Sequence, residues 1–436
     1  MLYGHQKQKN KDQIYKKNVF SLRLMKDYNK KTLYYLILAL AIASINLTYF
    51  VKFYIANKYL PAPFILDLNN TFMDFYNPLS WSIKNDAYLA WKSVYPPINF
   101  IFLKFISYRF EIISINPFEL RNSNTKLSYI IMLIYLSIII YSFTCNKFNT
   151  FKIRENILFS MLIVISTPVL FAIERGNLVV FSLLFLTLYI NSRNRINELF
   201  CLIFLMNIKP YFVILLIAKA NKKYKDYKFV FFAILFCALV SMLTGLFVDF
   251  NIFNFIENYL GFGKSGVMPA QDILMLPSSI NALSSYGSID KKIHSFQAFL
   301  TALKIVNYCA IIFLIYLAVN KNLNFEELLL LLIILITNFS TSVGGYSYIF
   351  YIPIIPIILS NKLYKKLIIY IAIIFIFPLD LISIYGMECP NQSIFSYLGQ
   401  DVITNQICKF SAGSVIRPIC NFLLMCNFIY LTIQKK

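Results

Sequence analysis

Apolar runs of about 20 residues recur along the whole of this 436-residue chain. Each run is long enough to cross the hydrocarbon core of a bilayer as a helix, which satisfies its own backbone hydrogen bonds. Only 14% of the residues are charged, against roughly 25% in an ordinary soluble domain. The sequence therefore predicts an all-α polytopic membrane protein and argues against a soluble globular fold.

The charge of the chain is strongly basic, with a formal net charge of +21. Its Lys and Arg residues stand in short runs between the apolar stretches, which is the pattern of the positive-inside rule. We therefore expect basic turns against anionic membrane lipids and no nucleic-acid partner. The longest basic run lies in the arm 1–32 and predicts a cytoplasmic N-terminus, and Lys435-Lys436 predicts a cytoplasmic C-terminus. The chain is expected to reside in the cytoplasmic (inner) membrane.

The remaining residues, 33–436, are expected to form a single integral membrane domain with outer loops at 56–95, 249–298 and 385–414. About ten crossings are predicted, at roughly 33–55, 127–145, 157–173, 178–191, 229–248, 299–319, 327–340, 347–360, 364–384 and 415–432. Because the crossing 127–145 ends at Lys147, the outer loop 56–95 and this basic turn should lie on opposite sides of the membrane.

Two apolar segments do not have the pattern of full crossings. The stretch 96–115 contains Lys104, Arg109 and Glu111, so it is expected to be re-entrant or interfacial. The segment 199–218 has basic residues near both ends and Lys209-Pro210 at its centre. Proline removes a backbone donor and breaks a helix, so a re-entrant hairpin is predicted here.

Cysteine and histidine limit the chemistry that is available. Cys389 and Cys408 lie 19 residues apart in the last predicted outer loop, where either a disulfide or two free thiols fit the sequence. The chain has only two histidines, which excludes a His-rich metal site.

The first outer loop contains three of the 20 acidic residues and ends in Tyr95-Pro96-Pro97. Asp67 and Asp86 have the surroundings of turn or cap residues. Asp74 lies among aromatic residues near the membrane surface, where partial burial makes a carboxylate a better base. It is the candidate catalytic residue, with a helix cap or a solvated carboxylate as the alternative.

Cations inside or beside apolar runs are the second kind of candidate, because charges there are costly and usually functional. Arg175 and Lys209 are such residues, and Lys264 in the glycine-rich outer loop is a weaker one. A phosphate is a natural partner for each of them. Glu174 could instead neutralise Arg175.

The order of these residues resembles a known family. An outer-loop Asp is followed by Tyr95-Pro96-Pro97, then by the turn Arg175-Gly176-Asn177, and then by Ile208-Lys209-Pro210-Tyr211. This set, with Ser279-Ile280-Asn281 further on, resembles the membrane glycosyltransferases of the GT-C superfamily, specifically the glycosyltransferase family 87 (DUF2029-like) type. The resemblance covers roughly 60–360.

The resemblance implies an inverting transfer of a sugar, such as the hexose mannose, from a polyprenyl-phosphate donor to a glycan or glycolipid acceptor on the outer side. Asp74 would be the general base. Substrate-binding positions would be Tyr95, Arg175, Asn177, Lys209 and Lys264. No cofactor is expected, although Asp67 and Asp74 together could hold a divalent metal ion.

The stretch 341–348 departs from the family pattern, which often has a histidine here. Any role of that histidine must be absent or be filled by Tyr346 or Tyr348. Three other functions remain open from the sequence: a transporter or flippase of a lipid-linked or anionic substrate, a glycan polymerase or ligase, and a structural membrane subunit. The transporter is disfavoured by the lack of an internal repeat.

Overall fold

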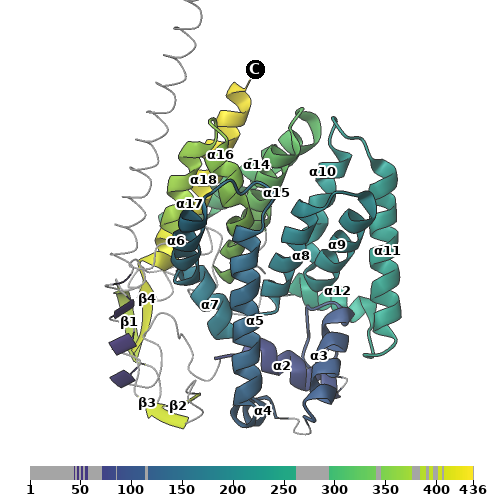
Figure 1. Ribbon diagram of the computed structural model, residues 1–436, viewed down its shortest axis with the longest axis vertical. Coiled ribbons are helices and arrows are strands. Elements are labelled where there is room, and N and C mark those ends of the chain that lie inside the picture. The colour runs from purple at the N-terminus through teal and green to yellow at the C-terminus, as the bar shows by residue number, and fades with distance from the viewer. Residues whose placement is uncertain are drawn as a thin grey trace, which may run out of the picture.

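The computed structural model describes residues 71–84, 86–112, 116–261, 294–339, 345–375, 383–388, 392–395, 401–404 and 407–435, with a few helical positions between 44 and 56. For 294, 295 and the strands within 383–411, only the backbone is described. The protein is a bundle of roughly parallel and antiparallel helices (Figure 1). The arm 1–32, most of the predicted crossing 33–55, Asp67 and Lys264 lie outside the described residues.

Four helices are long and apolar enough to cross a membrane: α5 (Thr125–Thr144), α11 (Tyr227–Gly245), α14 (His294–Asn320) and α18 (Gly413–Gln434). A fifth is obtained if the bent pair α6 (Ile153–Val164) and α7 (Thr167–Arg175) is counted as one span. The described part of the chain thus has the apolar helices of a membrane protein, but it does not reach the predicted ten spans.

The other apolar segments are shorter. They are α8 (Val179–Asn191), α15 (Phe325–Phe339), the 3-10 helix η4 (Gly345–Ile354) with α16 (Ile355–Ser360), and η5 (Lys365–Leu367) with α17 (Ile368–Phe375). Every residue from Glu327 to Asn338 is buried. Helix α15 is therefore at the centre of the bundle, where its side chains contact protein on all faces.

The predicted single crossing at 157–173 is broken in the structure. Helices α6 and α7 meet at an angle of 57°. Pro168 lies in the first turn of α7, where its missing N–H costs nothing but prevents a continuous helix. The Ser166 hydroxyl satisfies one freed carbonyl by donating to the Ile163 oxygen at 2.6 Å. The bend directs the end of α7 toward the segment 71–84.

The chain reverses direction at Lys209, which agrees with the hairpin part of the prediction for 199–218. Helix α9 (Arg195–Ile208) leads into Lys209, and the 3-10 helix η2 (Pro210–Leu216) with α10 (Ile217–Ala220) runs back. The two ends of the hairpin are joined by an ion pair between Lys219 Nζ and Glu198 Oε2 at 2.6 Å. Lys209 is thereby the tip of the hairpin.

Four helices gather at one end of the bundle, which we call the site end: α2 (Met73–Lys84), α3 (Pro97–Arg109), α4 (Pro117–Ser123) and α12 (Ile252–Gly261) (Figure 1). Helix α3, which belongs to the segment predicted to be re-entrant or interfacial, lies at this end of the bundle. Its Lys104 Nζ donates to the Phe247 carbonyl just beyond α11, at 2.8 Å.

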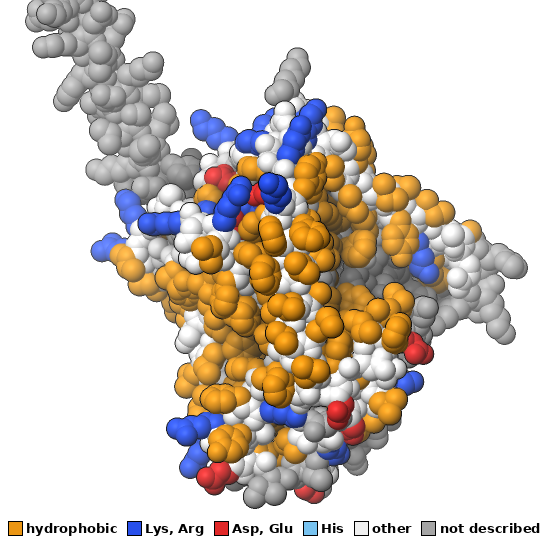
Figure 2. Space-filling model, turned by 90° about the vertical axis from the view of Figure 1, so that its right-hand side faces the viewer, with side chains coloured by type: hydrophobic (Ala, Val, Ile, Leu, Met, Phe, Trp, Pro, Cys, Tyr) orange, Lys and Arg blue, Asp and Glu red, His pale blue; other side chains and the backbone are white. Residues whose placement is uncertain are grey.

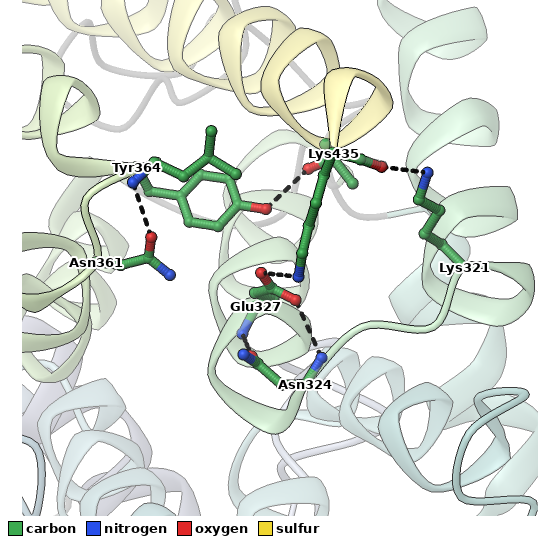
Figure 3. Close-up of polar contacts among 8 residues, drawn as sticks. Lys321, Asn324, Glu327, Asn361, Tyr364 and Lys435 are labelled. Atoms are coloured by element: carbon green, nitrogen blue, oxygen red, sulfur yellow. Dashed lines mark hydrogen bonds and ion pairs between the residues drawn. The ribbon is translucent and has the colours of Figure 1, made fainter.

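The opposite end, which we call the basic end, holds the C-terminus and the Lys-rich turns (Figure 1). A buried Glu327 near the start of α15 accepts from Lys435 Nζ at 2.5 Å and from the Asn324 backbone N–H at 3.1 Å. Lys321 Nζ donates to the Lys435 carbonyl at 3.1 Å. These contacts fix the end of α18 against the start of α15 (Figure 3).

The surface between the two ends is apolar. Figure 2 shows a broad band of hydrophobic side chains, with Lys and Arg side chains gathered above it and charges of both signs below it. On α11 this band includes Phe231, Leu235, Leu239 and Met242, which are 63%, 47%, 47% and 70% exposed. Such an exposed belt belongs against lipid.

Four short strands depart from the all-α prediction. They are β1 (Ser383–Glu388), β2 (Gln392–Phe395), β3 (Asp401–Thr404) and β4 (Ile407–Ser411). Strand β1 pairs antiparallel with β4, and β2 with β3. They lie in the predicted outer loop 385–414, except that β1 begins at 383, within the predicted crossing 364–384. Cys408 is opposite Met387 in this ladder. Cys389 lies outside the described residues, so the sequence leaves both a disulfide and two free thiols open.

Candidate functional site

Asp74 is held by two side chains that arrive from a distant part of the sequence. Arg175 Nη2 lies 2.7 Å from Asp74 Oδ1, and Asn177 Nδ2 donates to Asp74 Oδ2 at 2.6 Å. Arg175 ends α7, and Asn177 follows it by two residues. The Asp74 and Arg175 side chains are only 18% and 19% exposed. The alternative of a solvated loop carboxylate is therefore wrong for Asp74, which lies in the first turn of α2.

The backbone before α2 docks directly onto the end of α7. The Phe72 N–H donates to the Glu174 carbonyl at 2.7 Å, and the Thr71 hydroxyl donates to Glu174 Oε1 at 2.9 Å. Arg175 forms its ion pair with Asp74, whereas the Glu174 carboxylate accepts from Thr71. The carboxylate seen paired with Arg175 is therefore that of Asp74. The two segments are locked in register, which sets the position of Asp74.

Two left-handed residues make this close approach. Phe72 has φ +62° and Gly176 has φ +64°. A Cβ at position 176 would lie 2.8 Å from Phe72 Cδ1, so only glycine fits there. A phenylalanine in the left-handed region is strained, and such strain persists where the surroundings fix it and often accompanies function.

Side chains from α4, α5 and α2 support the docked backbone. Arg121 Nη1 donates to the Thr71 carbonyl at 3.1 Å, and the Tyr135 hydroxyl donates to the Gly176 carbonyl at 3.1 Å. The Tyr76 hydroxyl bonds to Ser128 at 2.8 Å. Burial raises the pKa of Tyr76 to about 12, although the Ser128 hydrogen bond and the Arg121 charge lower it. Tyr76 therefore stays neutral at ordinary pH.

Lys209 brings a second cation to the site from the tip of the hairpin. Its Nζ lies 4.2 Å from the centre of the Tyr95 ring, in a cation–π arrangement. It is also close enough to Asp74 for the carboxylate charge to act on it. The hairpin thus places an ammonium group on the same site as the Asp74–Arg175 ion pair.

Tyr95 is positioned by the proline pair that follows it. Pro97 begins α3, and the first turn of a helix is a position that suits proline. Asn99 Nδ2 donates to the Pro96 carbonyl at 3.0 Å and to the Asn207 carbonyl at 3.1 Å. This bridge ties the start of α3 to the end of α9, immediately before Lys209. The proline pair therefore also fixes one wall of the site.

The described residues 345–348, at the start of η4, border the site. Tyr211 follows the hairpin tip, and its hydroxyl and that of Ser347 are both buried. The Tyr346 ring packs on Phe171 of α7 with centroids 5.7 Å apart. Hydroxyl groups from η2 and η4 thus occupy the side of the site next to Lys209.

Five of the candidate residues come together: Asp74, Tyr95, Arg175, Asn177 and Lys209. Asp86 instead accepts from Trp91 Nε1 at 3.0 Å within its own loop, as a turn residue would. Lys264 and the 279–283 segment lie outside the described residues. Among the described residues, no group of three or more His, Cys, Asp and Glu side chains is placed to hold a metal ion.

Sequence reasoning missed three supporting residues. Arg121, Tyr135 and Asn207 are all nearly inaccessible, with exposures of 2%, 0% and 0%. Tyr135 and Asn207 stand inside apolar helices, where a polar side chain needs a partner. That signal was available, and it could have singled them out before the structure was known.

Together the fold and this site define the chain as a helical membrane protein with an Asp–Arg–Asn cluster and a nearby lysine at one end of its bundle. No family model, no curated protein and no solved structure matches the chain.

Proposed function

We propose that the protein is an integral membrane glycosyltransferase that moves a sugar from a polyprenyl-phosphate donor to a hydroxyl of a glycan or glycolipid acceptor. The observation that carries the proposal is the grouping of Asp74 with Arg175, Asn177 and Lys209 at one end of an apolar bundle. A lipid-borne phosphate requires cations near the membrane surface, and activation of a hydroxyl requires a base beside them.

In the proposed reaction, Asp74 takes the proton of the acceptor hydroxyl. The acceptor oxygen forms a bond to the anomeric carbon while the bond from that carbon to the phosphate oxygen breaks, with inversion. The leaving phosphate gains negative charge, which Lys209 and Arg175 stabilise. The hexose, with mannose as one example, comes from the resemblance of the motif order to glycosyltransferase family 87.

The geometry of Asp74 is suited to this role. Arg175 and Asn177 each occupy one carboxylate oxygen, and each oxygen retains acceptor capacity for a substrate hydroxyl. The two donors fix the orientation of the carboxylate before substrate arrives, so less ordering is left for the reaction itself. Arg175 can also face an incoming phosphate without leaving Asp74, because a guanidinium has five donors.

The proposed orientation puts the site end outside the cytoplasmic membrane and the basic end with both termini in the cytoplasm, following the positive-inside rule. Lys84 at the site end and Lys152 at the start of α6 are both exposed. A membrane-impermeant thiol reagent should label Lys84→Cys in intact cells beyond the level of the parent chain, and Lys152→Cys only after permeabilisation. The reverse pattern would invert the proposed orientation.

A transporter or flippase of a lipid-linked substrate is the second candidate, because the chain breaks at Lys209-Pro210 within an apolar segment, as transporter helices do at binding sites. A glycan polymerase or ligase would use the same donor chemistry with a growing glycan as the acceptor.

Reconstituted protein with radiolabelled polyprenyl-phosphate hexose separates these functions. The glycosyltransferase proposal predicts label in a new product that depends on added acceptor glycolipid, and no product from a nucleotide sugar. Movement of intact donor between leaflets without a new product would replace the proposal with the transporter. Long products made in steps from one chain would indicate a polymerase.

A further inference from the structure

Helix α12 exposes apolar side chains on its outer face, whereas a surface helix of a soluble protein exposes polar ones. Its partly buried positions are Asn254, Phe255, Asn258 and Tyr259, and its exposed positions include Ile252, Phe253, Ile256 and Leu260. The last four are 48%, 79%, 47% and 65% exposed. In water, such a helix would bury its apolar face. Two of the four side chains that face the protein here are asparagines.

The contacts that dock α12 are specific. Asn258 Nδ2 donates to the Tyr88 carbonyl at 2.9 Å, and the Phe255 ring packs on Tyr88 with centroids 6.2 Å apart. The Tyr88 hydroxyl donates in turn to the Tyr95 carbonyl at 2.9 Å. The exposed apolar face is therefore held outward by a built interface.

The loop 86–95 has the same character. Leu89 is 79% exposed and Trp91 is 46% exposed, and they lie between the exposed lysines Lys84 and Lys92. Trp91 stacks on Trp81 with ring centroids 5.7 Å apart. Exposed aromatic and aliphatic side chains flanked by lysines are typical of segments that lie in the headgroup region of a bilayer.

Continuity with the lipid belt decides what covers these residues. Helix α12 follows α11, and the turn between them exposes Leu246 and Phe247 by 80% and 68%. The belt on α11 thus continues through these two side chains to the outer face of α12, and the exposed Asp249 and Asn251 lie at the junction, as polar groups at headgroup depth would. We propose that α12 and the loop 86–95 form an interfacial platform that lies in the bilayer headgroup region at the site end. The proposal does not depend on glycosyl transfer.

The platform has a consequence for the site. The Tyr88–Tyr95 hydrogen bond joins it to the residue whose ring contacts Lys209. Membrane contact at the platform therefore holds this wall of the site at the level of the lipid headgroups.

The chain provides its own reporters, because Trp81 and Trp91 are its only two tryptophans. In full-length Trp81→Phe protein reconstituted into phosphatidylcholine vesicles, emission from Trp91 should be quenched by lipid brominated near the headgroup more than by lipid brominated near the chain end. Water-like emission that bromolipids leave unchanged, and that acrylamide quenches, would overturn the proposal.

Helix α12 is tested in the double Trp81→Phe, Trp91→Phe background, with one tryptophan returned at Phe253 or at Phe255. The outward Phe253→Trp reporter should be quenched by shallow bromolipid more than the inward Phe255→Trp control. If Phe255→Trp does not yield monodisperse protein, Asn254→Trp takes its place. Equal quenching at both positions would contradict the proposal. Shielding of Phe253→Trp from both bromolipid and acrylamide would also contradict it, and would indicate a protein partner.

Discussion

The Asp74 carboxylate accepts a hydrogen bond from Arg175 Nη2 at 2.7 Å, although the two residues are 101 positions apart in the chain. The bend between α6 and α7 and the left-handed turn at Gly176 bring them together. Both side chains are mostly buried, which makes the ion pair a stronger constraint than a surface salt bridge. The pair joins the first turn of α2 to the last turn of α7.

A double-mutant cycle measures this coupling. Asp74→Asn and Arg175→Gln should each lower the melting temperature in detergent, and the double variant should lose little more than the worse single variant. A charged hydrogen bond of this kind contributes about 1.5–3 kcal/mol. Additive losses in the double variant would show that the two residues are not coupled.

Gly176→Ala should destabilise the protein, because its Cβ would lie 2.8 Å from Phe72 Cδ1 and its φ is +64°. Strain at such a position costs about 1–3 kcal/mol, which thermal unfolding in detergent would detect. Gly261→Ala is the matched control, since a Cβ there meets nothing within 4 Å. Equal melting temperatures for the two variants would show that the turn at Gly176 has room for a Cβ beside Phe72.

The sequence could single out Asp74, Arg175 and Lys209 for a simple reason. An ionisable group in so apolar a chain is costly and therefore conspicuous. It could not show that Asp74 meets Arg175, because that contact depends on how helices pack and not on any local pattern. Pro168 indicates a helix break near Ser166, because proline cannot continue a helix. The apolar residues on both sides of Pro168 nevertheless favoured one straight crossing. The strands of 383–411 pair segments too short to predict from periodicity.

Lys209→Met tests the proposed phosphate contact. The change keeps a long apolar stem but removes the charge beside Tyr95 and Asp74. The KM for the polyprenyl-phosphate donor should rise about 10- to 100-fold, the range that a lost charged hydrogen bond gives. Lys366→Met at the basic end, where the side chain is exposed, should leave KM unchanged. A normal donor KM in Lys209→Met would remove this lysine from the donor site.

The basic end offers a stability test that is separate from the site. Lys435→Met leaves Glu327, which is 3% exposed, without its ammonium partner. Because Lys435 itself is 37% exposed, the loss should be modest, about 1 kcal/mol. Glu327→Gln combined with Lys435→Met should recover part of it, since no unpaired buried charge remains. Melting curves in detergent give the comparison, and a further loss in the double variant would contradict this account.

The proposed role of Asp74 as the general base is tested by the substitution Asp74→Asn. The amide keeps the size of the side chain but cannot take up the proton of the attacking hydroxyl group. Hexose transfer from the polyprenyl-phosphate donor by reconstituted protein should fall by about 10²- to 10⁴-fold. Asp226→Asn is the matched control, because Asp226 is ion-paired with Arg195 at 2.9 Å far from the site, and it should keep near-normal transfer. Near-normal transfer by folded Asp74→Asn protein would contradict the account.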